Sequence, residues 1–306
     1  MKLLLLGCNG QVGWELQRAL LPLGEVTALD FDTTPRADFT RIDELAARVA
    51  SERPDVIVNA AAHTAVDKAE GEPELARTIN ALAPGALARE AAALGALLVH
   101  YSTDYVFDGS GEQPRDEDAP TGPLSVYGRT KLEGEESIRA SGCPHLILRT
   151  SWVYAARGGN FARTMLRLAA ERDRLTVIDD QIGAPTGADL LADLTSHTVR
   201  SALRQPGLCG TYHAVAAGAT SWHGYARHVV EWARARGHPV KVAPEAIEPV
   251  PTTAFPTPAR RPLNSRLATT RLQRTFALAL PAWQVGVDRM LEEVLGASPQ
   301  KNGSPR

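Results

Sequence analysis

The feature that most restricts the fold of this chain is a glycine-rich turn near its start. The stretch LLLLGCNGQVGWELQ places a Gly-x-x-Gly-x-x-Gly pattern directly between an apolar run and a helix-length segment. At such a junction the backbone N–H groups and the positive end of the helix dipole face a phosphate, and the glycines let the backbone approach it. The pattern therefore predicts a dinucleotide-binding βαβ unit, with a purely structural turn as the alternative. The residues expected at the cofactor here are Gly7, Asn9, Gly10, Gln11, Val12 and Gly13.

Short apolar runs alternate with helix-length segments through the first half of the chain. The runs lie at residues 3–6, 26–29, 55–60, 96–102 and 145–151, and the candidate helices lie at 11–21, 42–51, 73–94 and 125–140. The runs are continuously apolar, as expected of parallel strands that are buried on both faces. The alternation predicts an α/β fold with a Rossmann-type, doubly wound parallel sheet.

The composition changes after about residue 150, where prolines break the chain into short elements. We expect a dinucleotide-binding domain over residues 1–150, to which the chain returns at about 175–215 through strands at 175–179 and 211–215. A smaller mixed α/β substrate-binding domain is expected over 151–295, interleaved with the first and containing helices at 222–236 and 283–294. The polar tail, 296–306, is rich in Gly, Ser and Pro and is predicted to be disordered.

The bulk composition excludes several classes of protein. A formal net charge of -2 favours neither a nucleic-acid partner nor adsorption to a membrane. The first apolar run is too short to span a bilayer and lacks the flanks of a signal peptide. The 3 cysteines are scattered without the spacing of metal ligands, which is typical of a cytoplasmic protein with reduced thiols.

Acidic and small residues follow the second and third apolar runs. Asp30 stands about twenty residues after the turn, where an acid can hydrogen-bond the adenosine ribose. This position favours NADH, although Arg36 lies close enough to permit NADPH as well. The pair Asp38 and Phe39 is expected to frame adenine, with a solvated loop acid as the alternative for Asp38. Small residues that let a cofactor lie across the strand ends are Ala60, Ala61, Ala62 and Thr64, although close helix packing explains them equally well.

Hydroxyl groups and a lysine are placed where a carbonyl could be reduced. Ser102 and Thr103 end the fourth predicted strand, and Tyr127 and Lys131 share one face of the following helix because they are four residues apart. A phenol beside an ammonium loses its proton more easily, so Tyr127 is expected to be the proton donor, with its pKa lowered by Lys131. Thr103 can hydrogen-bond the reacting oxygen. Ser102, Tyr127 and Lys131 are also expected to contact the cofactor.

These motifs together resemble those of an extended short-chain dehydrogenase/reductase. Within that superfamily, the stretches GCNGQVGWELQRAL, DVIVNAAAHTAVDKAE, STDYVFDG, YGRTKLEGE, LRTSWVY, GGNFARTML, DQIGAPT and RRPLNSRL are similar to those of the dTDP-4-dehydrorhamnose reductase family. The similar stretches run from residue 7 to residue 267. The resemblance implies reduction of the C4 keto group of dTDP-4-dehydro-L-rhamnose by NADPH or NADH, with Tyr127 as the proton donor, Lys131 as its electrostatic partner and Thr103 at the carbonyl.

The resemblance also implies roles outside the catalytic group. Thr103, Asp104 and Trp152 match positions that hold the sugar in the family. Arg261 matches a signature in a substrate-domain loop, where the resemblance implies that it either contacts the nucleotide phosphates or orders the loop. Core packing is the alternative for Trp152 and a surface ion pair for Arg261. Some members resemble a homodimer linked by Mg²⁺, and the acids at the matching positions are Glu15, Asp189 and Glu293; solvated surface acids are the alternative.

Two rival functions follow from related proteins. A nucleotide-sugar dehydratase needs an additional acid after Thr103 and Asp104, where this chain has Tyr105; an epimerase of the same superfamily is the neighbouring alternative. A regulatory subunit of methionine adenosyltransferase resembles this family without being an enzyme. The complete set of Thr103, Tyr127 and Lys131 favours the reductase.

Overall fold

A central parallel sheet organises the protein. The computed structural model describes residues 1–296. Its sheet has the strand order β10-β5-β4-β3-β1-β2, and every neighbouring pair is parallel. The strands are β1 (Lys2–Leu6), β2 (Glu25–Leu29), β3 (Val56–Asn59), β4 (Leu97–Thr103), β5 (His145–Thr150) and β10 (Gly210–His213). The predicted Rossmann-type sheet is therefore confirmed, together with the strands at 3–6, 26–29, 55–60, 96–102, 145–151 and 211–215.

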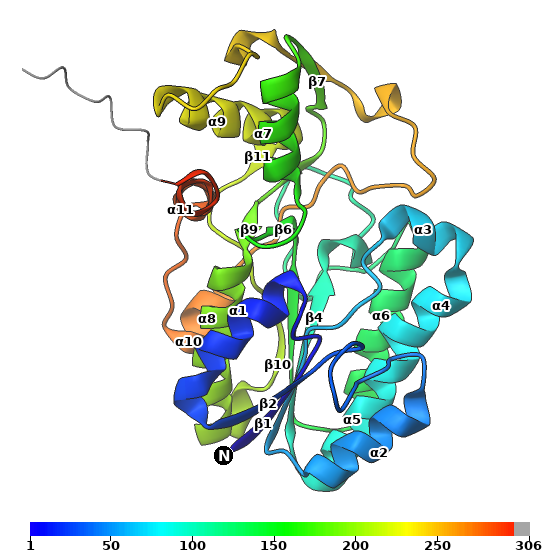
Figure 1. Cartoon of the computed structure of the whole chain (residues 1–306). Helices are drawn as coiled ribbons and strands as arrows, with labels where there is room; N and C mark the ends of the chain where they lie inside the picture. Colours follow the sequence, from blue (N-terminus) through cyan, green and yellow to red (C-terminus); the bar gives the residue numbers. More distant parts are fainter. Residues whose placement is uncertain (297–306) are drawn as a thin grey trace, which may run out of the picture.

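Helices cover both faces of this sheet, which explains why its strands are continuously apolar. In β1, Leu3 and Leu5 pack on one face and Leu4 and Leu6 on the other. The first face is covered by α1 (Gln11–Leu20), α8 (Ala188–Arg204) and α10 (Thr270–Phe276), which lie on one side of the sheet in Figure 1. The opposite face is covered by α2 (Ile42–Glu52), α5 (Ala83–Leu94) and α6 (Val126–Ala140). The two helical layers leave the carboxyl ends of the strands accessible at one edge.

Shorter elements separate α2 from α5. They are α3 (Val66–Gly71), α4 (Pro73–Arg77) and a single π-helical turn, η2 (Thr78–Leu82), which leads directly into α5. The side chain of Asn80 in this turn donates to the Thr130 hydroxyl (3.2 Å) and to the His63 carbonyl (3.1 Å), so the turn is tied to α6. The helix predicted over 73–94 is thus present, with an interruption by the π-turn.

A second lobe lies beyond the carboxyl ends of the central strands. Its apolar core is formed by α7 (Phe161–Glu171), α9 (Trp222–Ala235) and α11 (Trp283–Leu295), with the two-stranded parallel sheet of β7 (Leu175–Ile178) and β12 (Ile247–Val250). Figure 1 shows this lobe above the sheet. Two small pairs, β6 (Val153–Tyr154) with β9 (Thr186–Gly187) and β8 (Ile182–Gly183) with β11 (Thr220–Ser221), occupy the region between the lobe and the sheet.

The strand predicted at 175–179 is formed, but its predicted partner is wrong. We expected it to return to the central sheet, whereas β7 pairs with β12 in the second lobe. The chain returns to the central sheet through α8 and β10, and α10 then packs on the same face as α8. Disorder was predicted for residues 296–306. Of these, Gly296 is described, and the prediction for 297–306 lies outside the described residues. Each helix within residues 1–296 is too short or too polar to cross a bilayer.

Candidate active site

The glycine-rich turn joins β1 to α1 in the predicted way. Gly7 has φ +84°, and a Cβ there would lie 2.6 Å from the Ala61 nitrogen. A Cβ on Gly13 would lie 1.9 Å from the Gly7 carbonyl oxygen, so the helix can approach the turn only with glycine at that position. No side chain caps the start of α1 at Gly10, and its first turn contains no acidic residue. Its N–H groups and its positive dipole therefore face outward, as a bound phosphate requires.

A cavity of about 710 Å³ opens at the carboxyl ends of the central strands. This main cavity begins at the glycine turn and passes between the sheet and the second lobe. Sixteen of the residues predicted from the sequence line it: Gly7, Asn9, Gly10, Gln11, Val12, Asp30, Ala60, Ala61, Ala62, Thr64, Ser102, Thr103, Asp104, Tyr127, Lys131 and Trp152. Residues from five strand ends and two helices are thus brought together by the fold, although they are spread from residue 7 to residue 152.

Asp30 is oriented by the glycine turn itself. One of its carboxylate oxygens accepts the N–H of Asn9 (2.8 Å) and the other that of Phe31 (2.7 Å). The side chain of Asn9 donates in turn to Asp32 (2.6 Å). Asp30 therefore stands at the end of β2 with its carboxylate fixed beside the turn, where a ribose hydroxyl could donate to it.

The Tyr127 side chain is positioned by a close approach of α6 to the turn η3 (Asp104–Val106), which follows β4. Ser125 caps α6 by accepting the N–H of Gly128 (3.2 Å). A Cβ on Gly128 would lie 2.3 Å from the carbonyl oxygen of Tyr105, so glycine permits this contact. The rings of Tyr105 and Tyr127 then pack edge to face, with their centroids 5.4 Å apart. The phenol of Tyr127 lies beside Thr103 in the main cavity.

The electrostatic state of Tyr127 differs from our expectation. Burial raises the pKa of the phenol to about 12, a hydrogen bond with Thr103 lowers it, and the charge of Asp104 raises it. The ammonium of Lys131 does not act as the dominant influence that we predicted. The Lys131 Nζ instead lies 2.6 Å from the Tyr101 carbonyl oxygen and 3.2 Å from the His100 Nε2. The two residues line one cavity, but the pKa of the phenol is shifted by burial, Thr103 and Asp104, and not by Lys131.

Asp104 presents a second perturbed group. Burial raises its pKa to about 6, while hydrogen bonds with Ser265 and Thr103 lower it. One of its carboxylate oxygens has no hydrogen-bond partner, and the residue lines the main cavity. Buried carboxylate oxygens are seldom left unpaired. This oxygen is therefore available to a hydroxyl group of a bound molecule.

Trp152 forms part of the wall opposite the glycine turn. Its φ is +50°, which is uncommon for a residue with a side chain, and its indole stacks on Trp222 with centroids 3.6 Å apart. A Cβ on Gly183 would lie 2.8 Å from the indole, so this glycine makes room for the ring. Backbone strain of this kind concentrates at functional sites. The stacked pair therefore forms a rigid apolar wall of the cavity.

Arg261 lies outside the main cavity but beside it. It lines a neighbouring cavity of about 310 Å³, which also includes Tyr105 and Trp222. Its guanidinium donates to Asp67 (2.8 Å) and to the Thr257 hydroxyl. Because Tyr105 and Trp222 line both cavities, the side cavity continues the main one towards α7 and β7.

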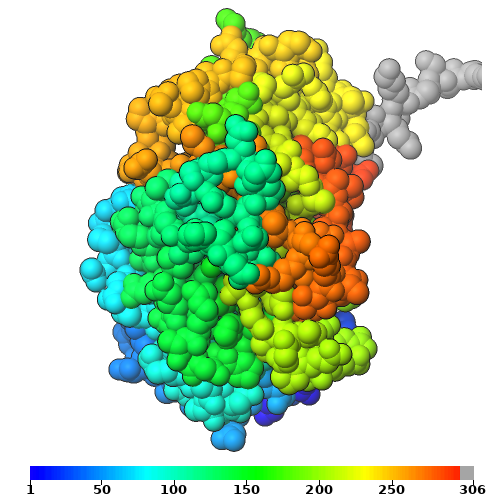
Figure 2. Space-filling model, turned by 180° about the vertical axis from the view of Figure 1, so that it is seen from behind, coloured from blue at the N-terminus to red at the C-terminus, as the bar shows by residue number. Residues whose placement is uncertain are grey.

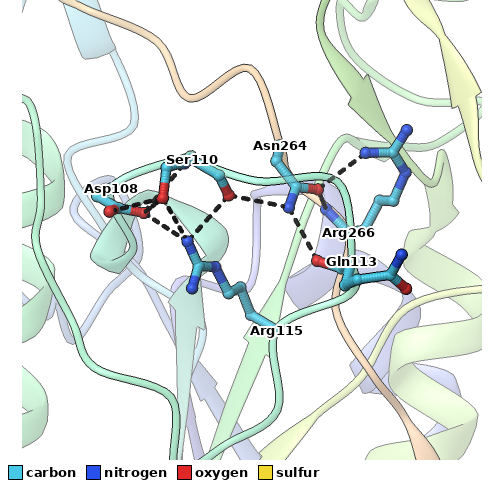
Figure 3. Close-up of polar contacts among 6 residues, drawn as sticks. All are labelled: Asp108, Ser110, Gln113, Arg115, Asn264 and Arg266. Carbon is cyan, nitrogen blue, oxygen red and sulfur yellow. Dashed lines mark hydrogen bonds and ion pairs between the residues drawn. The ribbon is translucent and has the colours of Figure 1, made fainter.

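A network of polar side chains fastens the loop after β4 to the C-terminal segment that contains Ser265. The Asn264 amide donates to the carbonyl oxygens of Gln113 (2.9 Å) and Ser110 (3.3 Å), and Arg115 donates to the Ser110 carbonyl (2.9 Å) (Figure 3). The backbones of Arg115 and residues 266–268 are also hydrogen-bonded. From behind, the teal surface that includes this loop adjoins orange C-terminal surface (Figure 2). The two segments thus hold Ser265 against Asp104.

Comparison with known proteins identifies the family. The RmlD substrate binding domain family matches residues 1–295. A dTDP-4-dehydrorhamnose reductase of Escherichia coli (strain K12) is 58% identical over 295 residues, covering 96% of this chain and 98% of the relative. The chain belongs to the dTDP-4-dehydrorhamnose reductase family.

Solved structures of this family share the fold. The reductase of Clostridium acetobutylicum superposes with a TM-score of 0.86 at 37% identity and covers 96% of this chain and 100% of its own. The reductase of Bacillus anthracis, in complex with NADP, superposes with a TM-score of 0.85 at 34% identity and covers 95% of this chain and 99% of its own.

Several predicted residues lie elsewhere than the main cavity. Gly13 lies beneath the turn. Asp38 is buried, and its carboxylate accepts hydrogen bonds from the hydroxyl (2.6 Å) and the N–H (2.9 Å) of Thr40. The hydrogen bond from the hydroxyl contributes most to lowering the pKa of Asp38. Phe39 packs in the core between the sheet and its covering helices. Neither Asp38 nor Phe39 lines the cavity, so their contact with adenine stays a prediction.

The three predicted metal ligands are close but do not form a complete site in one chain. Burial raises the pKa of Glu15, and the charges of Asp189 and Glu293 raise it further. Asp189 is paired with Arg289 (3.1 Å). Within residues 1–296, no three acidic, histidine or cysteine side chains form a group that could hold a metal ion.

The sequence left part of the cavity wall unassigned. The additional lining residues are Val66, Tyr101, Tyr105, Thr150, Ser151, Val153, Gly158 and Trp222. Tyr105 and Val153 lie inside the quoted motifs, next to predicted residues, so adjacency was the available signal. Trp222 begins α9 in the second lobe, and no local pattern connects it with Trp152.

Proposed function

We propose that this protein reduces the C4 keto group of dTDP-4-dehydro-β-L-rhamnose with NADPH or NADH, giving dTDP-L-rhamnose. The observation that carries the proposal is the meeting of Thr103, Tyr127 and Lys131 with the glycine turn in one cavity. Membership of the reductase family supports the same reaction. We also propose that it acts in the cytoplasm as the last step of dTDP-rhamnose biosynthesis.

The residues present fit a nicotinamide dinucleotide. The turn leaves no space for a side chain at Gly7 or Gly13, and the start of α1 has no side-chain cap. The buried Gln11 Oε1 has no partner within the structure described. The turn and α1 would hold the pyrophosphate, and Asp30 would hold the adenosine ribose. A bound reduced nicotinamide supplies the hydride.

The side chains of the cavity account for the rest of the chemistry. The Thr103 hydroxyl would orient the keto oxygen, and the Tyr127 phenol would donate its proton as that oxygen gains charge. Lys131 would stabilise the resulting phenolate by its charge. Asp104 and the Trp152–Trp222 wall would hold the sugar, and Arg261 would pair with the diphosphate, for which a guanidinium is suited.

The structure also bears on the dehydratase alternative. The position of the additional acid is occupied by Tyr105, which packs against Tyr127 and lines the cavity. Tyr105 has no carboxyl group, so the additional acid that a dehydratase needs is absent at this position. The reductase reaction needs no group at this position beyond those present.

A spectrophotometric assay tests the proposal. The keto-sugar is generated in place, and the loss of absorbance of reduced nicotinamide is followed with NADH and NADPH separately. We expect oxidation that depends on the keto-sugar, with dTDP-L-rhamnose as the product. If a folded protein binds the cofactor but oxidises neither NADH nor NADPH, the reductase proposal is wrong. That result would favour a non-catalytic protein similar to the regulatory subunit of methionine adenosyltransferase.

The Asp30→Ala variant is expected to discriminate between the cofactors. Loss of the carboxylate removes a hydrogen bond to the ribose 2′-hydroxyl of NADH. NADPH carries a phosphate in place of this hydroxyl and so does not make this hydrogen bond. We expect the Kd for NADH to rise by about tenfold, the value of one such hydrogen bond, and the Kd for NADPH to change less. Fluorescence titration of both cofactors measures this. Equal losses for the two cofactors would contradict the ribose contact.

We propose that the protein is a homodimer in which Glu15, Asp189 and Glu293 contribute to a Mg²⁺ site shared with a second copy. Support comes from the resemblance and from the closeness of the three acids. Sedimentation in the presence of Mg²⁺ and of a chelator tests this directly. A mass that stays monomeric in both conditions would remove the proposal.

A further inference from the structure

A buried chain of hydrogen bonds connects the end of β3 with Lys131 through His100. The Asn59 Nδ2 lies 3.1 Å from the His100 Nδ1, and the His100 Nε2 lies 3.2 Å from the Lys131 Nζ. The exposed fractions of Asn59, His100 and Lys131 are 1%, 0% and 2%. With solvent excluded, the donors and acceptors of this chain must match one another.

The direction of the chain is fixed at its first member. The backbone N–H of Ala61 points at the Asn59 Oδ1, 3.1 Å away. A backbone N–H can only donate, so this atom of the Asn59 amide must be the oxygen, and the NH₂ group faces His100. An amide NH₂ has no lone pair to offer. The Nδ1 of His100 must therefore accept, and the proton of the neutral ring resides on Nε2.

His100 is neutral in this environment. Burial holds its pKa well below the ordinary value for histidine, and the charge of Lys131 adds to this effect. The ring therefore carries one proton, at Nε2, and directs that N–H at the Nζ of Lys131. An ammonium group would meet it with hydrogen against hydrogen. A neutral amine would accept it and could still donate to the Tyr101 carbonyl at 2.6 Å.

The other charged groups around Lys131 only partly oppose this preference. Burial lowers the pKa of Lys131 to about 8, and Glu135, one turn further along α6, raises it. The Glu135 carboxylate is already occupied by Arg149 of β5 (2.7 and 2.9 Å) and by Ser102 of β4 (2.5 Å). The turn η3 contributes the acid Asp104, whose charge raises the pKa of Tyr127.

We propose that Asn59 and His100 are positioning residues that fix the imidazole proton at Nε2, favour the neutral amine of Lys131 and thereby set the alkaline limit of activity. The tautomer and its effect on the lysine follow from the hydrogen-bond geometry alone. The effect on turnover rests on the proposed reductase function, in which the charge of Lys131 stabilises the Tyr127 phenolate. Turnover is then expected to decline where Lys131 loses its proton.

The tautomer can be measured without any assay of activity. Protein labelled with ¹⁵N in its histidine rings gives long-range proton–nitrogen spectra that distinguish the two tautomers, and the His100→Gln variant assigns the signal by its absence. The expected result is a neutral ring protonated at Nε2 throughout the neutral range. A ring protonated at Nδ1, or at both nitrogens, would overturn the proposal whether or not the protein is a reductase.

The Asn59→Asp variant reverses the direction of the chain with little change in shape. A carboxylate accepts from both Ala61 and His100, so the ring proton is expected to move to Nδ1 and Nε2 to accept from an ammonium. We expect the titration of Lys131, followed by ¹³C-labelled lysine, to move up by about one pH unit or more. The alkaline decline of kcat should move with it.

A matched control separates the tautomer from the added charge. Asn80 is also buried beside α6 and contacts Thr130, not His100. In Asn80→Asp the tautomer should be unchanged and the Lys131 titration should move less. An equal shift in both variants, or a tautomer that inverts in Asn59→Asp without moving the lysine, would overturn the coupling.

Discussion

Replacement of Tyr127 by phenylalanine is expected to lower kcat by about 10²–10⁴-fold, the usual contribution of a general acid. The phenol is the group placed beside Thr103 in the main cavity, and the variant removes only its oxygen. The ring would keep its contact with Tyr105, so the cavity should retain its shape. Steady-state kinetics under saturating substrates measure kcat, and fluorescence titration measures the Kd of the reduced cofactor, which should change little.

The Tyr105→Phe variant provides the control for this experiment. It removes the same atom from a second ring that lines the same cavity. We expect a smaller loss of kcat than in Tyr127→Phe, because Tyr105 has no role in proton transfer. Comparable turnover by Tyr127→Phe and the unchanged enzyme would remove Tyr127 from the role of proton donor.

The Arg149→Met variant is expected to lower the free energy of unfolding by about 3–5 kcal/mol, because it removes the bidentate partner of a buried carboxylate. The side chains of Arg149 and Glu135 are 4% and 0% exposed, and they form a bidentate pair between β5 and α6. Urea denaturation at pH 7 measures the change. The matched control is Arg77→Met, which breaks a bidentate pair with Glu133. Glu133 lies on α6, the same helix as Glu135. That pair is 45% and 36% exposed, so its loss should cost about 0–1 kcal/mol.

The loss in the free energy of unfolding caused by Arg149→Met should depend on pH. Burial tends to raise the pKa of Glu135, but the hydrogen bond and charge of Arg149, with Ser102 and Arg139, hold it below its ordinary value. The stabilisation from this carboxylate is therefore present above the pKa of the unfolded chain and is lost as the pH falls through the folded pKa. In the variant Ser102 and Arg139 still contact the carboxylate, but the partner that most opposes the effect of burial is gone, and protonation of Glu135 relieves the cost of burying its charge. The difference between the two proteins should narrow in acid, and a constant difference would contradict this account.

The central sheet could be predicted because most of its strands are buried on both faces and therefore contain continuous apolar runs. The strand at 175–178 was predicted but assigned to the wrong sheet. It is half-exposed, and its partner strand contains Pro249, which is untypical of a central strand. Local patterns therefore revealed that an element exists, whereas the choice of its partner depended on packing in the second lobe.

The active site divides in a similar way. The glycine turn, Thr103, Tyr127 and Lys131 could be predicted because the reaction requires those groups at the ends of particular elements. The contacts of Lys131 could not, because His100 faces it from a neighbouring strand with no pattern in the sequence to connect them. Trp222 was missed for the same reason, since its stacking on Trp152 joins residues from different lobes.

The connection between the loop after β4 and the segment around Asn264 has a consequence for the order of folding. Asn264 and Gln113 are 151 residues apart in the chain, so closing this contact is slow compared with forming neighbouring βαβ units. The glycine turn and its flanking strands, by contrast, are close in sequence. During refolding from denaturant, affinity for the dinucleotide should thus return before turnover, which must wait until Ser265 has docked against Asp104.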